Sequence, residues 1–286
     1  MIINSYNLSR TFLAFGTLIT LLFNSNYTLF GLDVTHLNNT LFDYNLFFLL
    51  KDNLFLAKTL SILVLSLVIS GYYPRITGVL HWYVTFSFFL SSTVIDGGDH
   101  IATNLTLLLI PLTFLDTRSN HWSKINIKSE TKKILFKSFY LLIAIQVCVI
   151  YLHSFIGKLG VEEWKNGTAV YYWFTHNHFG VNEYVLPLTT KILSNKFIVT
   201  FMTWGTLLLE FILAASIILN QNDKKRYKLL LIGIIFHFSI IVVHGLVSFF
   251  FVMTSALILY LLPFQKHYTL KQIKSKQLWK QFINQF

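Results

Sequence analysis

Apolar runs of membrane-spanning length recur along the whole chain and are separated by short polar connectors. Because about 20 apolar residues cross the hydrocarbon core of a bilayer, this pattern predicts about eight transmembrane helices. The predicted spans are residues 11–30, 54–73, 79–95, 101–115, 134–156 and 197–219, and a run at 229–264 that we divide into two near Gly245. We therefore predict an all-α protein, a polytopic helical bundle, that forms a single membrane domain over residues 1–286.

The composition supports a membrane protein. Hydrophobic residues make up 54% of the chain and charged residues 12%, about half the charged share of a soluble domain. The formal net charge of +11 comes mostly from connectors and from the tail at 266–286, which favours contact with membrane lipids and excludes a nucleic-acid partner. A single cysteine, Cys148, excludes an intrachain disulfide.

The distribution of positive charge predicts the topology. If the eight spans alternate, most of the 23 Lys and Arg residues lie on one side, which the positive-inside rule assigns to the cytoplasm. We therefore expect a multi-pass cell-membrane protein with both termini cytoplasmic. The DGGDH motif at 96–100, the stretch 153–180 and the turn near Gly245 would then face outward. Residues 31–53 and the 266–286 tail could lie in the membrane interface as amphipathic segments.

Lys158 follows directly after a predicted span, in the sequence GKLGVEEW. Desolvation lowers the pKa of a lysine and turns it into a candidate general base. The alternative is a lysine that extends toward the interface and pairs with Glu162, one helical turn later. Trp164 and the aromatic residues after it are typical of an interfacial belt.

The DGGDH motif carries three further candidates, Asp96, Asp99 and His100. They could bind a cation, accept protons or form a hydrated turn, and we expect the two glycines to allow a sharp turn of the backbone. His176 and His178 resemble half of a metal site. A structural zinc site needs four ligands at close spacing, so we expect no metal centre.

Glu210 and His237 lie inside predicted spans, where an ionisable side chain is costly unless it faces protein or water. His244 follows His237 by seven residues and would lie on the same helix face. These residues are functional candidates. The alternative is a buried hydrogen-bonding network that fixes helix packing.

Three segments carry a resemblance to a known family: VIDGGDHIATNLTLLLIPLTFLD, YLHSFIGKLGVEEWKNGTAVYYW and FHFSIIVVHGLVSFFFVM. They resemble the SdpB family of peptide-toxin systems and, more distantly, the HTTM membrane domain shared with vitamin K-dependent gamma-carboxylase. The resemblance covers about residues 10–265 and leaves the basic tail outside. It implies an HTTM-like fold and a role, with an SdpA-like partner, in maturing a secreted SdpC-like peptide precursor.

The resemblance also implies site residues. In the carboxylase a lysine in a matching stretch acts as the base on a reduced quinone, and the corresponding residue here is Lys158. Matching histidines correspond to His100 and His237. We therefore take these three as the catalytic candidates. Six other residues are candidates for binding or support: Asp96, Asp99, Glu162, Trp164, Glu210 and His244.

The predicted function is that of a membrane maturation factor for an exported antimicrobial peptide toxin, with its site at the extracytoplasmic face. Three alternatives stay open: a non-catalytic export or presentation scaffold, a quinone-dependent carboxylase-like enzyme, and a proton-coupled transporter. Whether the chain catalyses a reaction also stays open. A reduced quinone follows from the resemblance alone, and we do not expect vitamin K, because the carboxylase uses a large luminal domain after its spans.

Overall fold

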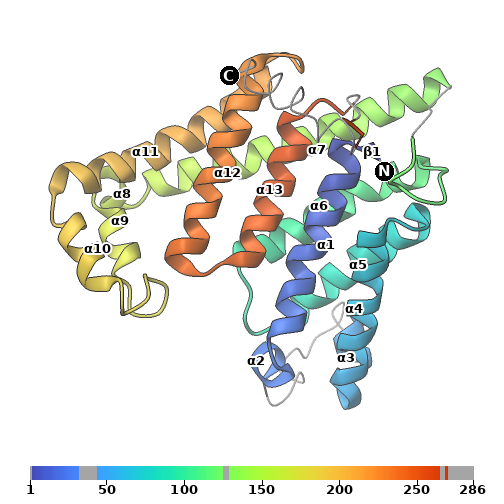
Figure 1. Cartoon of the computed structure of the whole chain (residues 1–286), viewed down its shortest axis with the longest axis horizontal. Helices are drawn as coiled ribbons and strands as arrows, with labels where there is room; N and C mark the ends of the chain where they lie inside the picture. Colours follow the sequence, from blue (N-terminus) through green and yellow to red (C-terminus); the bar gives the residue numbers. More distant parts are fainter. Residues whose placement is uncertain (1, 32–43, 125–128, 265–267, 270–286) are drawn as a thin grey trace.

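A computed structural model describes residues 2–31, 44–124, 129–264 and 268–269. Within these ranges the chain is helical apart from two short strands (Figure 1). The elements are β1 (Ile2–Ile3), α1 (Ser5–Phe23), α2 (Asn26–Phe30), α3 (Leu46–Leu49), η3 (Lys51–Asn53), α4 (Leu54–Ser70), α5 (Pro74–Ser91), α6 (Gly97–Leu115), α7 (Glu130–Leu159), α8 (Glu162–Lys165), α9 (Ala169–Phe174), α10 (Leu186–Leu193), α11 (Lys196–Ala215), η4 (Ser216–Ile218), α12 (Lys224–His244), α13 (Val247–Leu261) and β2 (Tyr268–Thr269).

Five helical segments in the described part of the chain are long and apolar enough to cross a membrane: Lys51–Ser70, Gly97–Leu115, Glu130–Leu159, Lys196–Ile218 and Lys224–His244. The protein is therefore a multi-pass membrane protein, but the prediction of about eight spans is wrong. Helices α1 and α5 have the length, but polar residues in their first halves lower their hydropathy, and α13 has only 15 residues. The second halves of α1 and α5 are apolar, and these apolar residues made each segment resemble a span in the sequence.

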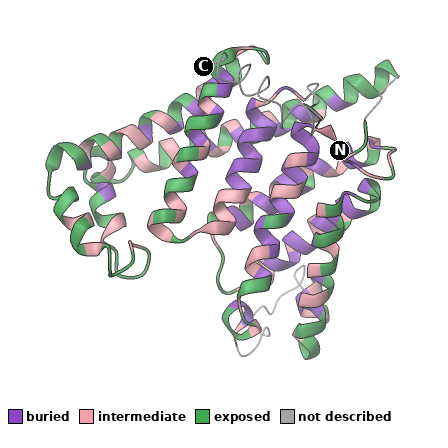
Figure 2. Ribbon diagram, viewed as in Figure 1, coloured by how far each residue is buried: buried purple, intermediate pink, exposed green. Residues whose placement is uncertain are grey.

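Helices α1 and α13 pack side by side in the centre of the bundle (Figure 1). Ser9 and Ser255 join them: each serine hydroxyl donates to the backbone carbonyl of the other residue, at 3.2 and 3.0 Å. Small polar residues let two helices approach closely in a membrane bundle. Figure 2 shows α13 buried along most of its length, so its apolar sequence reflects the protein core.

Two further packing units flank this centre. Helices α4 and α5 pack together on one side and form a separate apolar cluster with α1 and α3. On the other side α7 packs against α11. The segment from 160 to 195, which holds α8, α9 and α10, connects the end of α7 to the start of α11 and packs against α11 (Figure 1). We call it the outer segment.

The boundary near Gly245 is confirmed. Helix α12 ends at His244, Gly245 has φ +70, and α13 begins at Val247. Glycine adopts this left-handed conformation without the steric cost that a Cβ would bring. The long apolar run at 229–264 is therefore two helices.

The glycines of the DGGDH motif have a different role from the predicted sharp turn. Both lie in the first turn of α6, which begins at Gly97, and neither has a positive φ. A Cβ on Gly98 would lie 3.0 Å from the Cα of Phe249 in α13. Gly98 is therefore required for the close approach of α6 to α13.

A buried polar cluster ties the loop after α6 to α1. Arg10 is 1% exposed, and its guanidinium contacts the Nδ1 of His121 and the hydroxyl of Thr77, each at 3.1 Å. Arg118 pairs with Asp116 at 2.8 Å in the same loop. Burial, and then the charges of Arg10 and Arg118, lower the pKa of His121 to about 2.

Strands β1 and β2 pair in antiparallel fashion, with Ile2 opposite Thr269 and Ile3 opposite Tyr268. This pairing brings the beginning of the described chain to the same end of the bundle as its last described residues. The interfacial segment predicted within 31–53 lies partly outside the described residues, which resume at Tyr44 with α3 and η3 following. The predicted amphipathic helix in the tail lies outside them.

Candidate functional site

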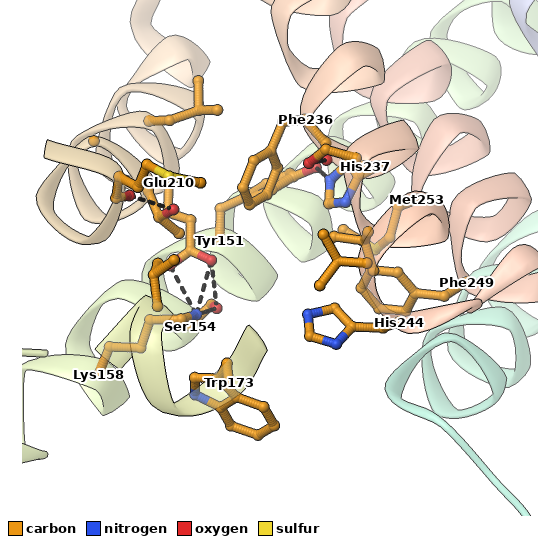
Figure 3. A pocket seen from close by; sticks show the side chains of 18 of the residues that line it. Tyr151, Ser154, Lys158, Trp173, Glu210, Phe236, His237, His244, Phe249 and Met253 are labelled. Carbon is orange, nitrogen blue, oxygen red and sulfur yellow. Dashed lines mark hydrogen bonds and ion pairs between the residues drawn. The ribbon is translucent and has the colours of Figure 1, made fainter. Parts of the chain in front are cut away.

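A cavity of about 720 Å³ lies between the α7–α11 pair and helices α12 and α13. Most of its lining is apolar or aromatic, and Trp164 of α8 and Trp173 of α9 contribute from the outer segment. Cavities of several hundred Å³ with a few convergent polar groups are the usual form of a small-molecule or cofactor site. The polar groups of this cavity gather at two places (Figure 3).

The first polar group contains Ser154, Lys158 and Glu210. The Lys158 ammonium lies 2.8 Å from one oxygen of the Glu210 carboxylate and 3.0 Å from the other. The Ser154 hydroxyl donates to the same carboxylate at 3.0 Å and also contacts the ammonium. The side chains of Lys158 and Glu210 are 23% and 7% exposed. The cavity therefore contains an ion pair that is shielded from bulk water.

This geometry corrects the predicted partner of Lys158. Glu162 does not pair with the ammonium and instead accepts a hydrogen bond from the Asn166 amide at 3.1 Å. The reason is that α7 ends at Leu159, so Glu162 starts a new short helix and leaves the face that carries Lys158. Trp164 of that helix covers the ammonium, with its ring centroid 5.3 Å from Nζ, a cation–π distance.

The second polar group joins Tyr151 of α7 to His237 of α12 (Figure 3). The hydroxyl of Tyr151 and the Nε2 of His237 are 2.8 Å apart, and both residues are 2% exposed. The Nδ1 of His237 has no hydrogen-bond partner among the described residues. The rings of Phe236 and Phe249 enclose the imidazole. This hydrogen bond therefore links α7 to α12 in an apolar surrounding.

His244 is the last residue of α12, and it connects this helix to the outer segment. Its Nδ1 contacts the carbonyl oxygen of Phe179. Trp173 and Phe174 of α9 meet its ring edge to face, with centroids 6.4 and 6.0 Å away. Because all three rings line the cavity, this contact fixes the outer segment as one of the cavity walls.

The remaining predicted residues lie outside this cavity. His100 is exposed and stacks on Phe89, with ring centroids 5.2 Å apart. Asp96 caps α6: its carboxylate accepts from the backbone amides of Gly98 and Asp99, and it also accepts from the Ser248 hydroxyl at 3.0 Å. Asp99 accepts from the Asp96 amide at 3.0 Å. These contacts form a capping box, which satisfies the free amides of the first helical turn.

The structure thus brings together Lys158, Trp164, Glu210, His237 and His244, and it adds two residues that the sequence analysis missed. Tyr151 and Ser154 precede Lys158 on α7 at intervals of three and four residues, which places all three side chains on one helix face. That spacing of polar residues inside an apolar run was visible in the sequence. Across the described residues no group of three or more His, Cys, Asp or Glu side chains is arranged to hold a metal ion.

Two curated proteins of Bacillus subtilis (strain 168) are similar to the chain over nearly its whole length. The sporulation-delaying protein SdpB is 42% identical over 273 residues, which cover 93% of this chain and 84% of SdpB. The chain belongs to the SdpB family. The uncharacterized protein YitO is 40% identical over 268 residues, which cover 91% of the chain and 85% of YitO.

No family model and no solved structure matches the chain. The SdpB resemblance seen in the three sequence segments is therefore confirmed by a match that covers 93% of the chain, whereas the more distant relation to the HTTM domain stays a prediction. The similarity to SdpB and YitO is not confined to these segments.

Proposed function

We propose that this SdpB-family protein is a membrane maturation factor for an exported antimicrobial peptide toxin, and that the cavity between α7, α11 and α12 is its working site. SdpB is by name a sporulation-delaying protein. From the family resemblance described above, we infer that this chain acts with an SdpA-like partner on an SdpC-like secreted precursor. The observation that carries the proposal is the Lys158–Glu210 ion pair at one end of an otherwise apolar cavity.

The reason lies in the energetics of that ion pair. Removing two charged groups from water costs several kcal/mol per ion before their attraction offsets it. A bundle that needed only helix packing would be as stable with apolar residues of similar volume at these two positions. A shielded ion pair beside a cavity supports a role in binding or proton transfer, with the Tyr151–His237 hydrogen bond as a second polar group in the same cavity.

The lining of the same cavity suits the reduced quinone that the carboxylase resemblance implies. The apolar and aromatic lining would accept the ring and tail of a reduced quinone, and Lys158 and Tyr151 would face its hydroxyl groups. Such a group would supply a redox-active hydroxyl. This chain's residues would hold and orient it, and the apolar walls would exclude water.

We also propose that both termini are cytoplasmic. The β1–β2 pairing, which joins the two ends of the described chain, supports a common side. The basic starts of α7 and α12, with Lys132, Lys133 and Lys225, support the cytoplasm as that side. An even number of crossings then requires that at least one helix beyond the five apolar ones also crosses. Cysteine labelling from either side of the membrane tests this at two exposed positions. One is Ser123, next to Trp122, whose carbonyl accepts from the Ile2 amide of β1, and the other is Asn182 of the outer segment. Labelling of both from the same side would contradict the proposal.

The test of function compares cavity residues with a lysine of the same helix that lies outside the cavity. Lys158→Met and His237→Phe are expected to abolish the mature exported peptide, measured by mass spectrometry of the culture medium and divided by the amount of protein in the membrane. Lys133→Met is the matched control, because Lys133 is exposed near the start of α7 and does not line the cavity. Normal peptide output from both cavity variants would overturn the proposal.

A non-catalytic scaffold that presents the precursor is the second candidate, and one observation favours it. Lys158 is fully engaged by Glu210, Ser154 and the ring of Trp164, as expected for a structural anchor. A scaffold would tolerate Lys158→Arg, which keeps the charge, and would fail when Trp173 is changed to Ala. A proton-transferring site would show the reverse order. Measuring peptide output and precursor capture for both variants separates the two functions.

A further inference from the structure

A second pocket, of about 110 Å³, lies at the other end of the α7–α11 pair. Lys137 lines it, and this residue precedes Lys158 by 21 positions on the same helix, which is about 30 Å at 1.5 Å per residue. The pocket is formed where α7 and α12 begin and where α13 and the α11–η4 segment end. It therefore lies near one end of the helical bundle, and it shares no lining residue with the cavity described above.

Arg226 forms the base of this pocket. It is 6% exposed and donates to the backbone carbonyls of Leu261 at 3.1 Å, Leu219 at 2.9 Å and Ser216 at 3.4 Å, and to that of Tyr260. A guanidinium has five N–H groups, so these four bonds leave one N–H for another acceptor. Among the described residues no carboxylate forms an ion pair with Arg226.

The other lining residues fit an anionic group with an apolar continuation. Lys137 adds a second cation and Gln221 an amide, and no carboxylate lines the pocket. Leu141 and Ala144, one and two turns along α7, and Ile217 of η4 make the apolar wall. The volume is several times the roughly 30 Å³ that one water molecule occupies in the liquid, which leaves room for a tetrahedral phosphate.

A purely structural role explains only part of this arrangement. A cation at the ends of α13 and of the α11–η4 segment stabilises their unpaired carbonyls, which accounts for the four bonds of Arg226. It does not account for the neighbouring Lys137, the Gln221 amide and the space between them. Basic pockets between transmembrane helices at the interface level bind lipid headgroups.

We propose that this pocket binds the phosphate of an anionic glycerophospholipid, with Lys137 and Arg226 facing the phosphate and an acyl chain lying along Leu141 and Ala144. The inference is independent of the proposed peptide-maturation function, since none of these residues lines the large cavity. A charge-assisted hydrogen bond is among the stronger contacts that a protein makes to phosphate, so the loss of Lys137 should weaken lipid binding by about tenfold.

Native mass spectrometry of the full-length protein in detergent, titrated with phosphatidylglycerol or phosphatidylcholine, tests the proposal. The wild type should retain one phosphatidylglycerol in preference to phosphatidylcholine. Lys137→Glu should lower that retention about tenfold, and Ala144→Phe should lower it by filling the apolar wall without changing any charge. Lys133→Glu is the matched control, because Lys133 lies one turn earlier on α7, is exposed and pairs with Glu130 at 2.7 Å.

The result that would overturn the site is phosphatidylglycerol binding by Lys137→Glu and Ala144→Phe that equals that of Lys133→Glu. A further arm distinguishes a lipid from free phosphate. Inorganic phosphate at the same concentration should not raise the unfolding temperature of the protein, whereas phosphatidylglycerol should. Equal stabilisation by the two would overturn the assignment to a lipid.

Discussion

Removing either charge of the Lys158–Glu210 pair should destabilise the fold, whereas removing both should not. In Glu210→Leu the ammonium loses the carboxylate that lies 2.8 Å away and faces an apolar cavity. Breaking a buried ion pair costs about 3–5 kcal/mol. Lys158 is 23% exposed and can extend toward water, so we expect the lower value, about 3 kcal/mol. Lys158→Met should cost a similar amount, because Glu210 then keeps only the Ser154 hydroxyl as a partner.

The double variant Lys158→Met/Glu210→Leu should return to within about 1 kcal/mol of the wild type, because neither charge is then buried alone. The assay is equilibrium unfolding in mixed micelles with increasing denaturing detergent, followed by tryptophan fluorescence. With about 3 kcal/mol for each single variant and about 1 kcal/mol for the double variant, the coupling free energy from the double-mutant cycle should be about 5 kcal/mol. The exposed pair Lys133–Glu130, at 2.7 Å, is the matched control and should give about 0.3–0.5 kcal/mol. A Lys158–Glu210 coupling no larger than this control would refute the reasoning.

Three further predictions follow from individual contacts. The pKa of His121 is lowered to about 2, so below about pH 6.5 the unfolded chain binds a proton that the folded chain does not. The free energy of unfolding of the wild type should therefore fall as the pH drops from about 7 to about 5, and that of His121→Asn should fall less. If the two proteins show the same pH dependence of this free energy, the reasoning is contradicted. Gly98→Ala should lower the free energy of unfolding by about 1–3 kcal/mol, because its Cβ would lie 3.0 Å from the Cα of Phe249. Gly97→Ala is the control: the nearest atom to its Cβ would be 3.8 Å away, so the same unfolding assay should show no change. Tyr151→Phe should cost about 1–3 kcal/mol by leaving the Nε2 of His237 unpaired and should reduce peptide output; unchanged stability would argue against this hydrogen bond.

Periodicity and composition predicted the helical membrane class, and glycine chemistry located the break between α12 and α13. They did not predict how many helices are apolar enough to span the membrane. The reason is that burial inside a bundle and burial in lipid select the same apolar residues. Helix α13, apolar throughout but buried by its neighbours, illustrates this ambiguity.

Side-chain partners were the harder part of the site. Lys158 was identified as a candidate, but its partner Glu210 is 52 residues away on a different helix. No local spacing rule reaches that far, and the nearby Glu162 was the natural but wrong choice. The family resemblance made both His100 and Lys158 catalytic candidates, yet the structure places His100 against Phe89 and outside the cavity. Its functional role stays a prediction.

The central claim is that the exported precursor is handled in the cavity, and site-specific photo-crosslinking in cells tests it most directly. A photoreactive amino acid at Leu209, which lines the cavity, is compared with one at the adjacent Leu208, which is 58% exposed on the outside of α11. We expect Leu209 to crosslink the SdpC-like precursor and Leu208 not to. Crosslinking from Leu208 alone, or from neither position while the peptide still matures, would contradict the account.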